Sequence, residues 1–317
     1  MKYAIISDIH GNKPALEAVL EDAKSQNVDG YIVVGDYCLS NPFPNECITT
    51  IRQLPNAYVI RGNEESYLEN LIGKDQTTWT DGQMQISYWC YKNVSEENLD
   101  YVLNLPRRID VTINSVPIHI AHSSAEFIEN FEHGEWNAAT VADRYREKPV
   151  TKEQVKEDIH NYYNTHLDFQ NYLKSMDSGI YIFGHTHIQW SYVSEDKKVI
   201  LINPGSCGIP LDCVTEGIPY TIMDLSDSKN IIVEEKRVPV DKKAYLDNII
   251  LSEQVLKANV WSKVIMKELA TAREHLTFFL QFAEKYATQI GDLQRPYSVK
   301  TWEEAYELWN KQYEKDK

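Results

Sequence analysis

Short apolar runs and amphipathic stretches alternate through the first third of the chain. The runs Tyr3–Ser7, Tyr31–Val34 and Ala57–Ile60 have the length and apolar content of buried strands. The intervening stretches Pro14–Gln26 and Pro44–Leu54 carry apolar residues at helical spacing. Strands that alternate with helices in this way predict a parallel sheet with crossover helices.

Further strands are predicted between residues 108 and 239. They are Arg108–Ile113, Val116–Ala121, Ile180–Phe183, Gln189–Val193, Val199–Asn203, Tyr220–Asp224 and Ile231–Pro239. The polar stretch Lys152–Met176 lies among them and predicts one or two helices, which we expect as an insertion on one edge of the sheet.

The pattern changes at Asp241, where the strand signals end. Apolar residues then recur three or four apart as far as Tyr286, which predicts a long amphipathic helical segment broken once. Thr301–Lys315 predicts a last helix. We therefore expect a catalytic domain of residues 1–240 and a helical C-terminal extension of residues 241–317. The apolar stripe of the extension should pack on the core or form a homodimer interface.

Charge and composition narrow the class of protein and of ligand. Lys and Arg number 32 and Asp and Glu 47, which gives a formal net charge of −15. A field of this sign repels nucleic-acid duplexes and anionic membranes, so a phosphate-bearing substrate would need local positive charge, which metal ions can supply. No apolar run is long enough to span a bilayer, and the run before Asp8 is too short for a signal peptide. The five cysteines are odd in number and lack a Cys-x-x-Cys pair, which favours free thiols and a cytoplasmic location.

Side chains of the kinds that bind metals follow five of the predicted strands. They are Asp8 and His10, then Asp36, Asn63 and His122, and finally His185 and His187. Because strand side chains alternate between faces, we expect Asp8 and His10 to point the same way, and likewise His185 and His187. Ligands bind outside the carboxyl ends of strands in open parallel sheets, and carboxylates with imidazoles suit a first-row divalent metal. The sequence therefore predicts a metal centre at this edge of the sheet.

The order and spacing of these residues resemble a known family. The series Asp8-x-His10, Gly35-Asp36, Gly62-Asn63, His122 and Gly184-His185-x-His187 resembles the calcineurin-like metallophosphoesterase superfamily over about residues 1–225. The segment Leu201–Ser206 is similar to the one that follows Gly-His-Thr-His in small bacterial members, such as phosphodiesterases and dinucleoside polyphosphate hydrolases. The resemblance implies an α/β fold, a four-layer αββα sandwich of two mixed β-sheets, followed here by the helical extension.

The resemblance also implies a centre of two divalent metal ions. One ion would be held by Asp8, His10, Asp36 and His187, and the second by Asp36, Asn63, His122 and His185, with Asp36 bridging them. A hydroxide between the ions would attack the phosphorus, and Asp36, Asn63 and His122 would be the catalytic residues. Nitrogen and oxygen ligands suit manganese, which we expect first, or iron, nickel or zinc.

One position departs from the usual series of the family. Most members follow Gly-Asn with a histidine that resembles a general acid, and in this chain Glu64 stands there. A carboxylate beside the transferring phosphoryl group would repel it unless Glu64 turns away or is protonated. We therefore expect weak acid assistance to the leaving group, which favours anhydrides and activated diesters over alkyl esters.

Three neighbouring side chains each allow two interpretations. Arg61 either offsets negative charge at the site or forms a salt bridge at the surface. Asn12 either contacts the substrate phosphate or serves as a turn residue. His119 lies three residues before His122 on a strand, so it should point to the opposite face as a packed or edge histidine.

These features predict an enzyme, namely a metal-dependent hydrolase of phosphodiester or phosphoanhydride bonds. Its partner would be a small phosphate-containing substrate, a nucleotide such as a dinucleoside polyphosphate. One alternative is a serine/threonine protein phosphatase, although such enzymes usually keep the histidine that Glu64 replaces. The other alternative is a metal-binding scaffold that has lost catalysis, against which the complete set of seven ligand-type residues argues.

Overall fold

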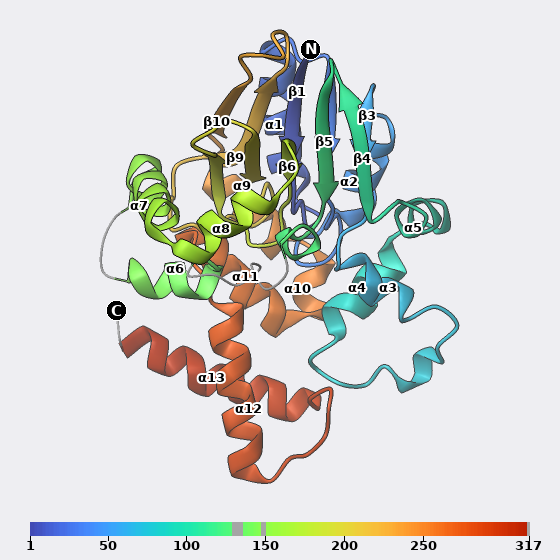
Figure 1. The fold of residues 1–317 in the computed structure, drawn as a ribbon. Coiled ribbons are helices and arrows are strands. Elements are labelled where there is room, and N and C mark those ends of the chain that lie inside the picture. The colour runs from blue at the N-terminus through green and yellow to red at the C-terminus, as the bar shows by residue number, and fades with distance from the viewer. Residues whose placement is uncertain (129–135, 147–149, 316–317) are drawn as a thin grey trace.

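The computed structural model describes residues 1–128, 136–146 and 150–315, which form two five-stranded sheets packed face to face (Figure 1). The first sheet has the order β10-β9-β1-β2-β3. Its strands are β1 (Lys2–Ile6), β2 (Gly30–Val33), β3 (Ala57–Val59), β9 (Ile218–Asp224) and β10 (Ile232–Val238). The strands β1, β2 and β3 are parallel, and β9 and β10 are antiparallel to their neighbours. Ile6 pairs with Val33, so β1 and β2 end at the same edge of the sheet.

The second sheet has the order β4-β5-β6-β8-β7. Its strands are β4 (Arg108–Ile113), β5 (Val116–Ala121), β6 (Gly179–Ile182), β7 (Gln189–Val193) and β8 (Val199–Pro204). The central strands β5, β6 and β8 are parallel, whereas β4 and β7 are antiparallel at the two edges. All ten strands expected from the sequence are present, and both sheets are mixed.

Aliphatic side chains fill the space between the two sheets. Ile5 and Ile32 of the first sheet and Ile118, Ile180 and Ile202 of the second are fully buried there. Full burial of one such side chain contributes about 1.5–3 kcal/mol. This layer therefore fixes the ends of the strands in one sheet relative to those in the other.

Helices cover the outer face of each sheet. The first sheet is covered by α1 (Lys13–Ser25), α2 (Pro44–Arg52), α4 (Gln85–Asn93) and α5 (Glu96–Leu103). The second is covered by α6 (Ala138–Arg144), α7 (Lys152–Thr165) and α8 (Leu167–Ser175). A short helix, α3 (Glu65–Glu69), follows β3. This arrangement confirms the four-layer αββα sandwich.

The expected position of Lys152–Met176 on a sheet edge was wrong. The helices α7 and α8 in this segment lie on the outer face of the second sheet, where Tyr163 and Phe169 pack with Trp190 of β7. The aromatic residues of these otherwise polar helices explain the position, because their side chains are buried against the broad apolar surface of the sheet face. The helices α3, α4 and α6 were not predicted, and for α3 and α6 five and seven residues are too few to show a periodic pattern.

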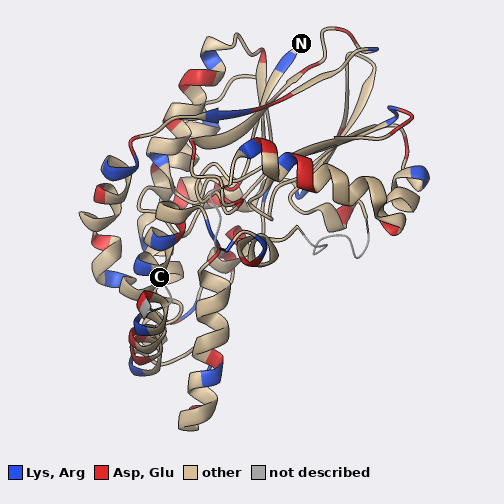
Figure 2. Cartoon of the chain, turned by 90° about the vertical axis from the view of Figure 1, so that its left-hand side faces the viewer, with Lys and Arg blue, Asp and Glu red and all other residues tan. Residues whose placement is uncertain are grey.

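The described part of the chain after residue 241 contains only helices. They are α9 (Lys242–Ile250), α10 (Glu253–Lys257), α11 (Asn259–Thr271), α12 (Leu276–Ile290) and α13 (Val299–Lys315). The apolar stripe is thus broken more than once, for example at Ala272, which has a left-handed backbone. The helices α12 and α13 extend below the sandwich in two perpendicular views, and Figure 2 shows charged residues of both signs along the helices of the face it presents (Figures 1 and 2).

The first three helices of this segment pack on the sandwich. Tyr245 and Ile249 of α9 and Ile265 of α11 form an apolar cluster with Ile209 and Leu211, which lie in the loop after β8. This loop also runs beside the carboxyl ends of the strands. Within the described residues, none of the helices combines the length and the apolarity that crossing a membrane requires.

Candidate metal centre

The structure brings all seven predicted ligand-type residues to one edge of the sandwich. Asp8 and His10 follow β1, Asp36 follows β2, Asn63 follows β3, His122 follows β5, and His185 and His187 follow β6. Asp8, His10 and His187 form one group, and Asp36, His122 and His185 form another; within each group the possible ligand atoms lie within 4.8 Å of one another. Asn63 adjoins the second group, because its Oδ1 lies 2.8 Å from His185 Nδ1.

The backbone of these residues differs from the strand geometry that the sequence suggested. Asp8, His10, Asp36, His185 and His187 all have positive φ, between 49° and 68°. Such left-handed conformations are costly for residues other than glycine, and they cluster at functional sites. The side chains converge because tight loops turn them inward, so the expected alternation along a strand was the wrong reason. It also failed to separate His185 from His187, which belong to different groups.

Two glycines allow the loops to approach so closely. A Cβ atom at Gly62 would lie 2.1 Å from Asp36 Oδ1, and one at Gly184 would lie 2.5 Å from Asp8 Oδ2. Either contact is far below van der Waals distance, so any side chain at these positions would displace a carboxylate of the site. The glycines of the Gly-Asn and Gly-His segments are therefore required by packing around the two aspartates.

Backbone carbonyls and Glu64 orient three of the four imidazole rings, whereas the fourth, His185, contacts Asn63 through Nδ1. His122 Nδ1 lies 2.6 Å from the carbonyl oxygen of Val34, and His187 Nδ1 lies 2.8 Å from that of Ile209. His10 Nδ1 lies 2.8 Å from Glu64 Oε2. A metal-binding histidine almost always donates its other ring N–H to such a group, which fixes its orientation. In His10, His122 and His187, Nε2 is the nitrogen that faces the centre.

The Nε2 atoms of His10, His122 and His187 lie close to one another or to carboxylates, as expected around a bound cation. His122 Nε2 is buried and has no hydrogen-bond partner among the described residues, although Asp36 Oδ2 lies 3.1 Å away. His10 Nε2 and His187 Nε2 lie only 3.0 Å apart, and Asp8 Oδ1 is 3.4 Å from the latter. Two carboxylates, four imidazoles and an amide oxygen fit divalent first-row ions. The roles of the seven residues as ligands stay predictions.

The charged side chains of the site favour a bound cation. Burial alone would lower the pKa of His10, but the Glu64 carboxylate and the two aspartates outweigh it and raise that pKa to about 10. Burial is likewise outweighed at His122, whose pKa is raised to about 10 by Asp36 and Asp8. Burial would raise the pKa of Asp8, yet the nearby histidines hold it well below its usual range. The site therefore attracts protons or metal cations.

Glu64 and Glu65 both support the centre from its edge. Glu64 is turned toward His10, as the short contact between them shows, and its backbone N–H donates to Asp36 Oδ1 at 2.9 Å. The fully buried Glu65 carboxylate accepts the backbone N–H groups of Tyr37 at 2.8 Å and Gly62 at 2.9 Å. It thereby joins the loops that carry Asp36 and Asn63. Sequence reasoning missed Glu65, although its place in the Gly-Asn-Glu-Glu run was a usable signal.

The three ambiguous side chains lie outside the centre. Asn12 is fully buried and caps α1, because its Oδ1 accepts the N–H of Ala15, so it is a turn residue. Arg61 pairs with Glu69 of α3, which matches the salt-bridge interpretation although the arginine is buried. His119 contacts Asp110 at 2.5 Å on β4 and stacks on Tyr181 of β6, so it is the packed histidine of the two alternatives.

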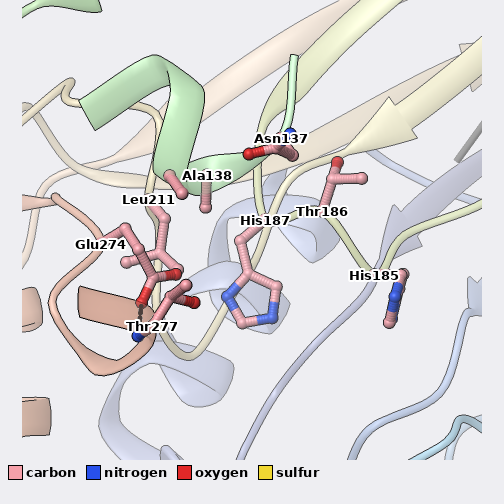
Figure 3. Close-up of a pocket in the computed structure, with 9 residues that line it drawn as sticks. Asn137, Ala138, His185, Thr186, His187, Leu211, Glu274 and Thr277 are labelled. Atoms are coloured by element: carbon pink, nitrogen blue, oxygen red, sulfur yellow. Dashed lines mark hydrogen bonds between the residues drawn. The ribbon is translucent and has the colours of Figure 1, made fainter. Parts of the chain in front are cut away.

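A cavity of about 380 Å³ opens beside the centre (Figure 3). His185, Thr186 and His187 form one wall of it. The remaining lining residues are Asn137, Ala138 and Ala139 of the α6 region, Leu211, Glu274 just before α12, and Thr277 in its first turn. Sequence reasoning missed Glu274 and Thr277, because the apolar stripe of this segment favoured a core or interface role. No local motif marks them.

Three comparisons place the chain among known proteins. The sequence model of the calcineurin-like phosphoesterase superfamily domain matches residues 1–228. An uncharacterised protein of Methanocaldococcus jannaschii is 31% identical over 250 residues, which are 76% of this chain and 89% of that protein. A metallophosphoesterase from Sphaerobacter thermophilus has a TM-score of 0.61 at 22% identity, and a hypothetical protein from Pyrococcus horikoshii OT3 has 0.60 at 18%. Each of these two matches covers 86% of this chain and 99% of the other, and such low identities show the fold alone.

Proposed function

Because the chain belongs to the calcineurin-like phosphoesterase superfamily and is therefore a phosphoric ester hydrolase, we propose that it hydrolyses phosphodiester or phosphoanhydride bonds in nucleotide-sized substrates. The observation that carries the proposal is the pair of ligand groups at the strand ends, whose inward imidazole nitrogens face buried carboxylates. The family depends on a dinuclear metal centre, and manganese is our first choice for both ions.

The roles of the side chains follow from their grouping. Asp8, His10 and His187 would hold one ion, and Asp36, Asn63, His122 and His185 would hold the other. Asp36 also lies within reach of His10, which suits a carboxylate shared by both ions. Bound divalent ions polarise phosphoryl oxygens and lower the pKa of a coordinated water. They would also supply the local positive charge that a phosphate needs on a chain of net charge −15.

The position of Glu64 supports a preference for good leaving groups. Its carboxylate is engaged with His10 Nδ1, so it orients a ligand and is not placed to donate a proton to a departing oxygen. Nucleotide phosphates and aryl oxides leave without such help, whereas alkoxides need it. Dinucleoside polyphosphates, cyclic nucleotides and activated diesters are therefore the substrates to test first.

The cavity supports a small substrate over a phosphoprotein. Its volume of about 380 Å³ falls within the range of about 300–1,000 Å³ that is usual for small-molecule sites. We propose accordingly that residues 1–240 are the catalytic domain, and that the extension 241–317 completes the wall of the substrate cavity.

The test is turnover of bis-p-nitrophenyl phosphate by protein stripped of metal and then supplied with Mn²⁺, Fe²⁺, Ni²⁺ or Zn²⁺. We expect hydrolysis only after metal is restored, with similar recovery on a dinucleoside polyphosphate or a cyclic nucleotide. Absence of turnover on all three substrates with all four metals would contradict the proposal and favour a non-catalytic scaffold. Turnover of a phosphopeptide alone would favour the protein phosphatase alternative.

A further inference from the structure

The cavity beside the metal centre has a second wall that comes from distant parts of the chain. The start of α6 contributes Asn137 and Ala138, and the start of α12 contributes Glu274 and Thr277, which face His187 across the cavity (Figure 3). This second wall carries none of the proposed metal ligands. It would therefore contact the part of a bound substrate that lies beside the reacting phosphate.

The residues that line the cavity disfavour the binding of a second phosphate group. Asn137, Thr186 and Thr277 offer neutral hydrogen-bonding groups, and Ala138, Ala139 and Leu211 offer apolar contacts. Among the described residues that line the cavity, none is a lysine or arginine, and Glu274 is the one acidic side chain. A second phosphate would need cationic partners there and would instead meet a carboxylate.

The negative charge of Glu274 is held in place. Its Oε1 accepts the backbone N–H of Thr277 at 2.6 Å, and the residue is buried. Behind it, Glu268 Oε1 accepts the N–H groups of His275 at 2.9 Å and Leu276 at 2.8 Å. Burial and the neighbouring Glu274 carboxyl group raise the pKa of Glu268 well above its usual range. Of these two acidic residues, Glu274 is the one that borders the cavity.

We infer that this cavity binds an uncharged organic group of nucleoside size, and that Glu274 selects against substrates with a second phosphate at that position. The inference rests on the proposed function and narrows it: it favours nucleotide diesters with one phosphate over dinucleoside polyphosphates. Glu274 would act on binding and not on the chemical step, because it lines the wall away from the ligand groups. Its effect should appear in KM and in product affinity, with kcat unchanged.

The experiment measures the affinities of AMP and ADP for the manganese-loaded full chain by calorimetry, with KM and kcat on bis-p-nitrophenyl phosphate in parallel. The Glu274→Gln variant should raise the affinity for ADP relative to AMP by about fivefold, the scale of one unit charge removed a few ångströms away. The Asn137→Asp variant should lower the same ratio by a similar factor. Asp is also a good N-cap, so this variant keeps the cap that Asn137 forms on α6.

A matched control removes the same charge elsewhere in the C-terminal helices. Glu303 is exposed on α13 and does not line the cavity, so Glu303→Gln should leave the ratio unchanged. Equal ratios in wild type, Glu274→Gln and Asn137→Asp would overturn the inference even if bis-p-nitrophenyl phosphate is hydrolysed. Opposite shifts in the two variants, with no hydrolysis, would support the inference and contradict the proposed function. Because Asn137→Asp changes the charge of the cavity at a second position on another element, instability of Glu274→Gln would not prevent a decision.

Discussion

The strand-end loops and the turn between α11 and α12 form opposite walls of one cavity, but they differ in how they are built. In the loops, proposed ligands sit in left-handed conformations that the sheets and glycines hold in place. In the turn, Ala272 is left-handed, Glu274 lies just before the N-cap of α12, and Thr277 lies in the first turn of that helix. From this contrast we infer that the proposed hydrolysis depends on the strained geometry of the strand-end loops. Selection of the substrate would depend only on the shape and charge of the opposite wall.

The largest expected effect lies in the loops. Asp36→Asn removes a buried negative charge that is in reach of both ligand groups. Hydrolysis of bis-p-nitrophenyl phosphate should fall by at least about 10²–10³-fold, since metal ions supply several kcal/mol of transition-state stabilisation. Metal analysis should show fewer than two ions per chain. Asp110→Asn on the exposed surface of β4 is the matched control and should keep both activity and metal. Normal metal content and full activity in Asp36→Asn would contradict the assignment.

The second effect is the dependence of the hydrolysis rate of the wild-type protein on the leaving group of the substrate. Because Glu64 is engaged with His10, no acid is expected beside the departing oxygen. Hydrolysis of alkyl esters should therefore lack the rate enhancement of about 10²–10⁴-fold that a general acid provides. Across a series of esters, the rate should fall steeply as the pKa of the leaving group rises. The measurement is a series of aryl and alkyl diesters. A flat dependence would mean that some residue, Glu64 included, supplies the proton.

The C-terminal helices should affect stability without affecting metal binding. Phe279 of α12 is fully buried against Trp302, Tyr306 and Trp309. Phe279→Ala should cost about 3–5 kcal/mol of unfolding free energy in denaturant titrations. The half-buried neighbour Phe278 is the control and should cost clearly less. If Phe279→Ala instead removes metal from protein that is still folded, the two walls are coupled more tightly than the structure indicates.

The smallest effect is a pH dependence confined to the loops. In the metal-free protein the pKa values of His10 and His122 are raised to about 10, so both imidazoles hold protons at neutral pH. A ligating imidazole must be neutral, so metal binding should release protons and metal affinity should rise with pH up to about 10. Calorimetry at pH 7 in buffers of different ionisation enthalpy measures this release. Metal binding without proton release would show that His10 and His122 do not lose protons when the metal binds, which would contradict this prediction.

Of the two cavity walls, the sequence predicted the residues of the strand-end loops but not those of the turn between α11 and α12. The ligand-type residues and the strands before them were predictable, because a buried strand followed by Asp, Asn or His is a local pattern. The left-handed backbone at Asp8 and His10 was not, since it depends on how loops from both sheets pack. Glu274 and Thr277 were not predictable either. They reach the cavity through the packing of α9 and α11 on the sandwich, which no local pattern records.

The existence of two metal sites is tested most directly by anomalous diffraction from crystals grown with Mn²⁺, with data collected at the manganese absorption edge. We expect two peaks per chain. One should lie among Asp8, His10 and His187, and the other among Asp36, Asn63, His122 and His185, with Asp36 within bonding distance of both. A single peak, or peaks away from these seven side chains, would contradict the assignment of a two-metal centre.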